Sequence, residues 1–377
     1  MVKYTAKRLA IVVSHPIQYF SPLFKELSKE IELKVFYAFH PSPEQQGKDG
    51  FNKAFQWDID LFDGYNYEFM VNVAKEPSTS YKKGCDTPEI GTSLSKYGAT
   101  HVVVFGWQLK TYTQTVTYCK RNSIPVAVRG DSQFDPEQSL LKKWVKQLYY
   151  PFFLKRFDYF LSVGKRNRSY LKRFGIKDHQ IIFSPHAVDQ QFWSGKTLRS
   201  DQVVVFLWVA KFISKKRPLD VIEAFKKACL KDKSIRLKMI GTGELIKKCK
   251  IEAKGISNIE FLGFKNQKVL RKEYLNSNTL ILTSDYKETW GLVVNEIFSC
   301  GLPVIVSSAC GCSPDLVNER TGIIYTYKNI AELTDAILQM SSMQKDKIDF
   351  KPAIQEINKI YSFERNVQSF MSFMDKS

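Results

Sequence analysis

The feature that most constrains this chain is a regular alternation of short β-branched runs with helical stretches. A first series of predicted strands occupies 9–14, 33–39, 100–105 and 125–129, and a helix is predicted over 22–29. A second series occupies 203–209, 236–240, 259–262, 279–283 and 303–307. Such alternation is typical of parallel sheets with helices on both faces. The sequence therefore predicts an α/β protein built from two such units.

The length of the chain supports this division. It has 377 residues, whereas one domain typically takes about 150. A stretch of Pro, Gly and polar residues over 184–202 separates the two strand series, so we place the boundary near Phe192. We expect a first domain over 1–191, a second over 192–361, and a C-terminal helix over 362–377 that crosses back to the first domain. Parallel sheets bind ligands beyond the carboxyl ends of their strands, so two facing units are expected to share a cleft.

Composition limits the classes of function. The hydrophobic share of 44% and the charged share of 25% are ordinary for a globular chain and argue against disorder. The net charge is +18, which favours an anionic partner: nucleic acid, an acidic membrane surface or a phosphorylated small molecule. Seven scattered cysteines with no C-x-x-C pair disfavour zinc sites and disulfides. With no apolar run of about 18 residues, we expect a cytoplasmic protein.

The most informative segment lies between residues 285 and 314. It is expected to contain a strand end, a turn at Gly291, a helix through Cys300 and a further strand. The first amides of a helix lack backbone acceptors, so those of Gly291, Leu292 and Val293 are predicted to bind an anion. Glu288 and Glu296 would lie on roughly the same side, at most ~12 Å apart along the axis. They fit the two ends of a nucleotide-sugar, although two solvated glutamates on an amphipathic helix are the plain alternative.

A cluster of basic residues follows the first strand of the second unit. Lys211 comes at the end of the strand, and Lys216 lies just before Pro218, which is expected to open a helix. Two ammonium groups there suit a diphosphate, because they neutralise the charge that grows on a leaving group. Lys215 and Arg217 are expected to be solvated. An ordinary basic turn would explain the same residues.

These motifs resemble those of the retaining family-4 (group 1) glycosyltransferases, which have the GT-B fold of two facing Rossmann-like domains. Glu288 to Glu296 is similar to their E-x7-E motif. The resemblance extends to HPIQYFSPLF, WDIDLFDGY, RGDS, SPHAVD, VAKFISKKRPLD and GLPVIVS, and so runs from Ser14 to about Gly322 in the manner of one bacterial branch. Departures also occur, since Ser14-His15-Pro16 replaces a Gly-Gly pair, Arg217 a glycine, and Cys312 the second glycine of another pair.

The resemblance implies roles for these residues. Lys211 and Lys216 would neutralise the phosphates, Glu288 would contact the donor sugar, and Glu296 would bind the ribose. It further implies a hexosyltransferase that keeps the anomeric configuration, because the leaving phosphate takes the proton of the acceptor. Such an enzyme needs no metal and no cofactor beyond its donor substrate, for which a UDP-sugar is the leading expectation.

Other candidate residues lie near predicted strand ends. Asp131 could orient a sugar, although an Asx turn is nearly as good an interpretation. We assign His15 and Arg129 to the acceptor side, while His15 could instead cap the first helix and His186 could lie at the domain hinge. Two further donor-side candidates are weaker: Gly241, in a turn after a strand, and Phe264, which borders the nucleobase or packs in the core.

The stretch over 138–173 interleaves ten Lys and Arg residues with aromatic side chains and contains a single acid, Asp158. Cations beside aromatic rings suit an anionic membrane surface, on the inner face of the cell membrane, where a lipid-linked acceptor would lie. A helix with buried aromatics and solvated lysines is the alternative.

Three functions therefore remain. The leading one is a glycosyltransferase acting on a glycan or lipid-linked acceptor in bacterial surface polysaccharide or glycolipid synthesis. A nucleotide-sugar epimerase of the same fold would need acid and base side chains that the motif does not clearly supply. A nucleic-acid-binding protein is disfavoured, because no binding signature accompanies the charge.

Overall fold

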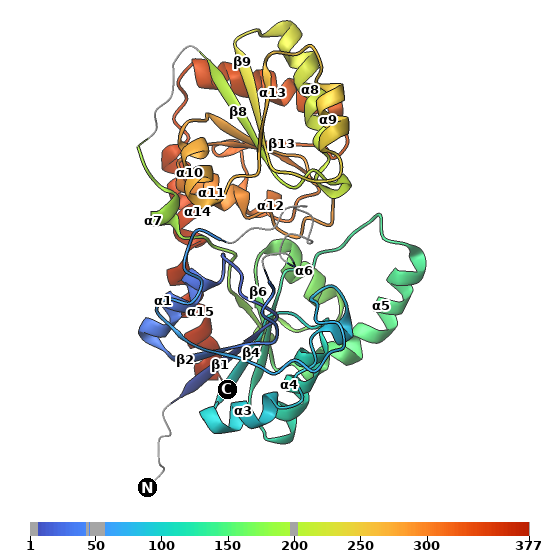
Figure 1. The fold of residues 1–377 in the computed structure, drawn as a ribbon, viewed down its shortest axis with the longest axis vertical. Coiled ribbons are helices and arrows are strands. Elements are labelled where there is room, and N and C mark those ends of the chain that lie inside the picture. Colours follow the sequence, from blue (N-terminus) through green and yellow to red (C-terminus); the bar gives the residue numbers. More distant parts are fainter. Residues whose placement is uncertain (1–6, 43–44, 46–56, 197–202, 377) are drawn as a thin grey trace. The chain divides into compact units, whose positions relative to one another are not determined.

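A computed structural model describes residues 7–42, 45, 57–196 and 203–376 (Figure 1). The chain divides into two compact units. The first takes the residues up to Ser42, Ile59–His186 and the chain from Ser362 onward, and the second takes Ala187–Tyr361 together with Asp58. The main boundary thus follows His186, a few residues before the predicted one. The reason is that helix α7 (Gln190–Trp193) packs on a helix of the second unit, and the Gln190 side chain donates to the carbonyl oxygen of Asn358 at 2.8 Å.

The first unit contains a seven-stranded sheet in the order β3-β2-β1-β4-β5-β6-β7. Its strands are β1 (Arg8–Val13), β2 (Glu32–Tyr37), β3 (Asn66–Phe69), β4 (His101–Val104), β5 (Val126–Gly130), β6 (Tyr159–Ser162) and β7 (Ile181–Phe183). Every neighbouring pair is parallel. The strand order reverses between β1 and β4, and the loops that follow these strands leave the same edge of the sheet.

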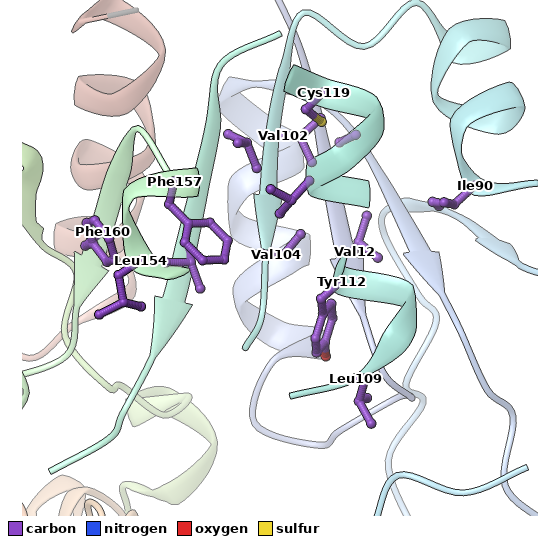
Figure 2. Packing of buried hydrophobic residues seen from close by; sticks show 14 of the residues in the cluster. Val12, Ile90, Val102, Val104, Leu109, Tyr112, Cys119, Leu154, Phe157 and Phe160 are labelled. Atoms are coloured by element: carbon purple, nitrogen blue, oxygen red, sulfur yellow. The ribbon is translucent and has the colours of Figure 1, made fainter. Parts of the chain in front are cut away.

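The helices of this unit are α1 (Ser21–Glu30), α3 (Ile90–Tyr97), α4 (Lys110–Arg121), α5 (Leu140–Phe153), α6 (Lys165–Arg173) and α15 (Phe363–Lys376). Strand β1 shows how they cover both faces, since alternate residues of a strand point to opposite sides. Ala10 and Val12 join a core with residues of α3, α4 and α6, whereas Leu9 and Ile11 join a core with residues of α1 and α15. Figure 2 shows Val12 and its neighbours in the first of these cores.

The C-terminal helix α15 completes the second core of the first unit. Phe370, Phe373 and Met374 are buried beside residues of α1. The side-chain amide of Asn366 donates to the carbonyl oxygen of Pro185 at 2.9 Å, and the Ser184 hydroxyl donates to the side-chain oxygen of Asn366 at 2.7 Å. The final helix therefore belongs to the first unit.

The second unit contains a six-stranded sheet in the order β10-β9-β8-β11-β12-β13, again parallel throughout. Its strands are β8 (Val204–Val209), β9 (Ile235–Ile240), β10 (Ile259–Gly263), β11 (Thr279–Leu282), β12 (Val304–Ser307) and β13 (Gly322–Tyr325). Its helices after α7 are α8 (Pro218–Lys231), α9 (Ile246–Glu252), α10 (Gln267–Leu275), α11 (Val293–Ser299), α12 (Ser313–Leu316), α13 (Ile330–Lys345) and α14 (Lys351–Ile360). Here the order reverses between β8 and β11.

All the strands predicted from the sequence are present, with ends that differ by at most two residues. Strands β3, β6, β7 and β13 were not predicted. β7 has three residues, β13 starts with a glycine, and β6 lies within the basic aromatic stretch. These short edge and near-edge strands are defined by pairing with their neighbours, which the local pattern does not record.

We predict that Phe370→Ala strongly destabilises the first unit. Its ring is fully buried, and removal of such a ring typically costs about 3–5 kcal/mol. Met371→Ala is the matched control, because the neighbouring side chain on the same helix is 43% exposed. Urea unfolding followed by circular dichroism should show a large decrease in unfolding free energy for the first variant alone. Equal losses in both would contradict the docking of α15.

Candidate active site

The predicted lysine loop follows β8 in the second unit. Lys211 lies two residues beyond the strand, and Lys216 ends a short 3-10 helix over Ser214–Lys216, just before α8 begins at Pro218. The amide of Phe212 donates to the carbonyl oxygen of Thr242 at 2.8 Å. The loops after β8 and β9 are thereby joined at the carboxyl edge of the sheet.

The loop after β11 is fastened to the lysine loop. The Thr283 hydroxyl accepts a hydrogen bond from the Trp208 indole at 3.0 Å and donates to the carbonyl oxygen of Lys216 at 2.8 Å. The amide of Asp285 donates to the carbonyl oxygen of Lys215 at 2.9 Å. Three hydrogen bonds at the reversal of strand order therefore fix the backbone that carries the lysine.

Lys216 and Glu288 form an ion pair at this place, with the ammonium group donating to Oε2 of the carboxylate. The Glu288 side chain is 12% exposed and that of Lys216 is 20% exposed. Burial raises the pKa of Glu288, but the charges of Lys216 and Lys215 and the hydrogen bond from Lys216 outweigh this effect and leave the pKa below its ordinary value. Glu288 is therefore ionised at neutral pH, and the structure brings together two of the predicted site residues.

The turn after Glu288 is held by the loop that follows β12. The amide of Gly311 donates to the carbonyl oxygen of Glu288 at 2.9 Å. A β-carbon on Gly311 would lie 1.8 Å from the carbonyl oxygen of Thr289, so this close approach requires glycine. Gly291 has a φ of +107°, which also favours glycine. Helix α11 begins at Val293 and not at Gly291 as predicted, so Gly291 and Leu292 belong to the turn that leads into it.

Glu296 lies in α11 and is buried, with 1% of its surface exposed. The hydroxyl of Tyr274, from α10, donates to Oε2 of Glu296 at 2.5 Å. Glu288 and Glu296 thus have different partners. Tyr274 was not predicted as part of the site, and its distance from Glu296 along the chain explains why the sequence pattern gives no sign of the contact.

Gly241 has a structural reason to be glycine. It lies directly after β9 with a φ of +136°, and a β-carbon there would lie 1.9 Å from the carbonyl oxygen of Ala210. Its absence of a side chain lets the loop that carries Lys211 approach closely. Phe264 follows β10 and is half-buried, and whether it borders a base stays a prediction.

Arg217 occupies the position where the resemblance implies glycine. Its φ is +49°, a left-handed conformation that is uncommon for other residues. Its guanidinium donates to both carboxylate oxygens of Asp220, at 2.6 and 3.0 Å, and lies 5.3 Å from the centre of the Tyr327 ring. The expectation that Arg217 is merely solvated is therefore wrong.

The candidate residues of the first unit gather at the carboxyl edge of its own sheet. Arg129 and Asp131 lie at the end of β5, and both line a cavity of about 130 Å³ with His186. Nε2 of His186 lies 3.9 Å from a carboxylate oxygen of Asp131, and burial, the largest influence, lowers the pKa of this histidine. His15 follows β1 and is half-buried, with its Nδ1 2.9 Å from the Ser14 hydroxyl.

Comparison with known proteins agrees with this arrangement. Residues 189–356, which make up most of the second unit, match the family model described as glycosyl transferases group 1. The second unit is thus similar to the group 1 glycosyl transferases. The lysine loop, the Glu288 turn and α11 all lie within the matched part.

Relatives and solved structures extend the comparison to the whole chain. An N,N'-diacetylbacillosaminyl-diphospho-undecaprenol α-1,3-N-acetylgalactosaminyltransferase of Campylobacter jejuni is 22% identical over 63% of this chain, and the aligned part spans 65% of that relative. A glycosyltransferase from Rickettsia africae covers 99% of both chains with a TM-score of 0.73 and 13% identity. Alr3699/HepE of Anabaena, in complex with UDP and glucose, covers 98% of this chain and 100% of its own, with a TM-score of 0.71 and 11% identity. The likeness to these solved structures establishes the GT-B type of fold, with two Rossmann-like domains.

We predict that Gly241→Ala disrupts the lysine loop of the second unit. Overpacking against a backbone oxygen and a strained positive φ together should cost about 3 kcal/mol or more. Gly255→Ala is the control, since Gly255 also has a positive φ of +82° but open space around it, and it should cost only about 1–2 kcal/mol. Thermal unfolding measures both, and similar losses would show that the close approach to Ala210 is unimportant.

Proposed function

We propose that this protein is a retaining glycosyltransferase. It moves a hexose from a nucleoside-diphosphate sugar, with a UDP-sugar as the leading candidate, to a glycan or lipid-linked acceptor. The observation that carries the proposal is the partly buried Lys216–Glu288 pair beside the glycine turn, at the reversal of strand order in the second unit. Ligands of open parallel sheets bind at this position.

The proposed chemistry needs positive charge where the leaving group forms. Lys216 and Lys211 neutralise the diphosphate as its bond to the anomeric carbon breaks. The acceptor oxygen bonds to that carbon from the same side, and its proton passes to a phosphate oxygen of the leaving group. Glu288 contacts the donor sugar, the turn amides at Gly291, Leu292 and Val293 lie beside the phosphates, and Glu296 binds the ribose. In this scheme the lysines take the place of a metal ion.

The compared proteins support the choice of substrates. The Anabaena structure holds UDP and glucose, and the name of the Campylobacter relative describes transfer of an N-acetylgalactosamine to a sugar carried on diphospho-undecaprenol. A lipid-linked acceptor and a role in bacterial surface polysaccharide or glycolipid synthesis are therefore part of the proposal. In this proposal His15 and Arg129 bind the acceptor, and Asp131 orients the acceptor or the donor sugar.

We predict that Glu288→Gln and Lys216→Ala each lower the rate of sugar transfer by about 10²-fold or more, the usual effect of removing one electrostatic partner of a transition state. Lys287→Ala is the matched control, because that neighbouring lysine is exposed. Transfer from a UDP-sugar is measured with and without EDTA, and NMR of the product reports the anomeric configuration.

Thermal unfolding should first show that each variant is folded. A single substitution leaves the other charge of the pair without its partner, which can destabilise the protein. The double variant Lys216→Ala/Glu288→Gln removes both charges and so separates this loss of stability from a loss of catalysis. Normal turnover in the single variants would reject the assigned roles. A complete loss of activity in EDTA, restored by metal, would reject charge neutralisation by lysine alone.

We further propose that α5 docks the protein on an anionic membrane surface, on the cytoplasmic side. Every residue of this helix is exposed or half-buried. Trp144 and Phe152 are 66% and 74% exposed, which supports membrane docking over the alternative of a helix with buried aromatics. Large apolar side chains are among the most exposed of the described residues, namely Leu140, Leu141, Trp144, Val145, Leu148 and Phe152. Their spacing of three and four residues places them on one side of the helix.

The setting of α5 fits this role. Tyr150 and Phe153 pack against the core of the first unit, and Figure 1 shows the rest of the helix extending away from the sheet. Lys142 is exposed beside the apolar side, and the ammonium of Lys155 lies 5.9 Å from the centre of the Phe152 ring. Apolar contact combined with flanking lysines, in a chain of charge +18, suits lipid headgroups of negative charge. Among the described helices, none is long and apolar enough to cross a membrane.

We predict that the triple variant Leu141→Glu/Trp144→Glu/Leu148→Glu loses binding to vesicles that contain anionic lipid, measured by co-sedimentation. The control Leu230→Glu/Ile251→Glu changes two side chains of the second unit that are 76% and 70% exposed, and should bind as the parent does. Sedimentation velocity tests the competing explanation, in which the apolar side of α5 contacts a second copy of the protein. A dimer that the triple variant abolishes, with vesicle binding unchanged, would assign the helix to self-association and overturn the proposal.

A further inference from the structure

The first unit contains a small cavity beside Arg129, and the proposed function does not specify which chemical group this cavity binds. It has a volume of about 130 Å³ and is lined only by residues of this unit. The lining includes a cationic side chain, Arg129, and the polar side chains of Gln108 and His186. A cavity of this size takes one chemical group and part of the molecule that bears it, since whole ligands of drug size need about 300 Å³ or more.

Arg129 is the buried cation of this cavity, with 4% of its surface exposed. Its guanidinium lies 5.5 Å from the ring centres of both Phe20 and Phe105, and one NH₂ group donates to the carbonyl oxygen of Pro185 at 2.9 Å. Within the described part of the chain, its Nε has no hydrogen-bond partner, and no carboxylate forms an ion pair with it. Buried arginines are almost always paired, because an uncompensated charge is costly to remove from water.

The charges around Arg129 leave it available to an anion. Burial lowers its pKa to about 10, against a raising effect of Asp131, so the guanidinium is still charged at neutral pH. Asp131 is 46% exposed and therefore screened by water, and one of its carboxylate oxygens lies 3.9 Å from Nε2 of His186. Since burial lowers the pKa of His186, this ring adds no positive charge at neutral pH. The cavity is thus lined by one buried guanidinium that carries a full positive charge and has an N–H donor without a partner among the described residues, and by the water-screened carboxylate of Asp131.

We propose that this cavity binds an anionic group, a carboxylate or a phosphate, on the acceptor of the transfer reaction. The inference rests on the proposed function, because it names the class of acceptor. A planar guanidinium with a free Nε–H matches oxygen pairs of either group, and the flanking rings hold it in one orientation. The cavity lies after β4 and β5, at the carboxyl edge of the sheet, where ligands of parallel sheets bind. The anion would compensate the charge that the protein leaves unpaired.

The test observes Arg129 directly in the full chain. The Nε–H resonance is followed by ¹⁵N NMR during titration with inorganic phosphate, with acetate, and with sodium chloride at matched ionic strength. We expect a saturable shift of this resonance with phosphate or with acetate and none with chloride. The anion that acts at lower concentration indicates whether the group on the acceptor is a phosphate or a carboxylate. Arg129→Lys assigns the resonance and should weaken binding of that anion by about tenfold or more, the value of a charge-assisted hydrogen bond.

Gln108→Glu provides a second variant that should fold normally, because Gln108 is exposed at the rim of the cavity. The added negative charge should weaken anion binding roughly tenfold. No response of the Nε–H resonance to either anion, or equal responses in Gln108→Glu and the parent, would overturn the inference and leave Arg129 a structural residue.

Binding of UDP to the second unit is measured in parallel by thermal shift. UDP binding without an anion response rejects only the anionic acceptor. An anion response without UDP binding rejects the proposed donor, and with it the assignment of the anion to an acceptor.

Discussion

The parallel pairing of β8 with β11 determines where the second unit can hold a ligand. These strands are neighbours in the sheet although α8, β9, α9, β10 and α10 separate them along the chain, and Leu280 lies opposite Leu207. The strand order reverses between them, so the helices that follow lie on opposite sides and leave room at the carboxyl edge. Both loops that carry the site start at this edge. The contact between Lys216 and Glu288 is therefore a consequence of sheet topology.

The partly buried ion pair also explains why the Lys216 and Glu288 side chains are positioned without a ligand. Glu288 tolerates burial because two lysines lower its pKa, and the backbone of one of them is fixed through Thr283 and Trp208. An ammonium group has three N–H donors, and Glu288 accepts only one of these bonds. The same lysine can therefore bind a phosphate oxygen without giving up its carboxylate. A positioned charge of this kind costs little reorganisation during a reaction.

The residues that could be predicted from the sequence are those whose role follows from their place beside a strand end. Lys216, Glu288 and Gly291 could be found in this way, because a strand, a turn and a helix succeed one another within a few residues. Tyr274 and Thr283 could not, since their contacts depend on how distant elements pack. The need for glycine at Gly311 could not be predicted either, because it arises from the close approach of this residue to the carbonyl oxygen of Thr289. Arg217 shows the opposite failure, as a general expectation about charged turns missed its bond to Asp220 and its ring contact.

The two units have closely similar topologies, yet they stabilise buried charge in different ways. In the second unit, Glu288 has a cation of its own chain, so the site is complete without a ligand and binding must share that cation. In the first, Arg129 is held by aromatic rings and a backbone carbonyl, which orient the guanidinium but do not neutralise it. Cation–π contacts contribute about 0.5–2 kcal/mol, less than the several kcal/mol that desolvation of an ion costs. The charge of Arg129 is therefore not fully compensated. It lies at the carboxyl edge of the sheet, where ligands of parallel sheets bind and where an anionic group could compensate it. A fully apolar core position would offer no such compensation, so the location of Arg129, and not its burial alone, supports the proposal that it binds an anion.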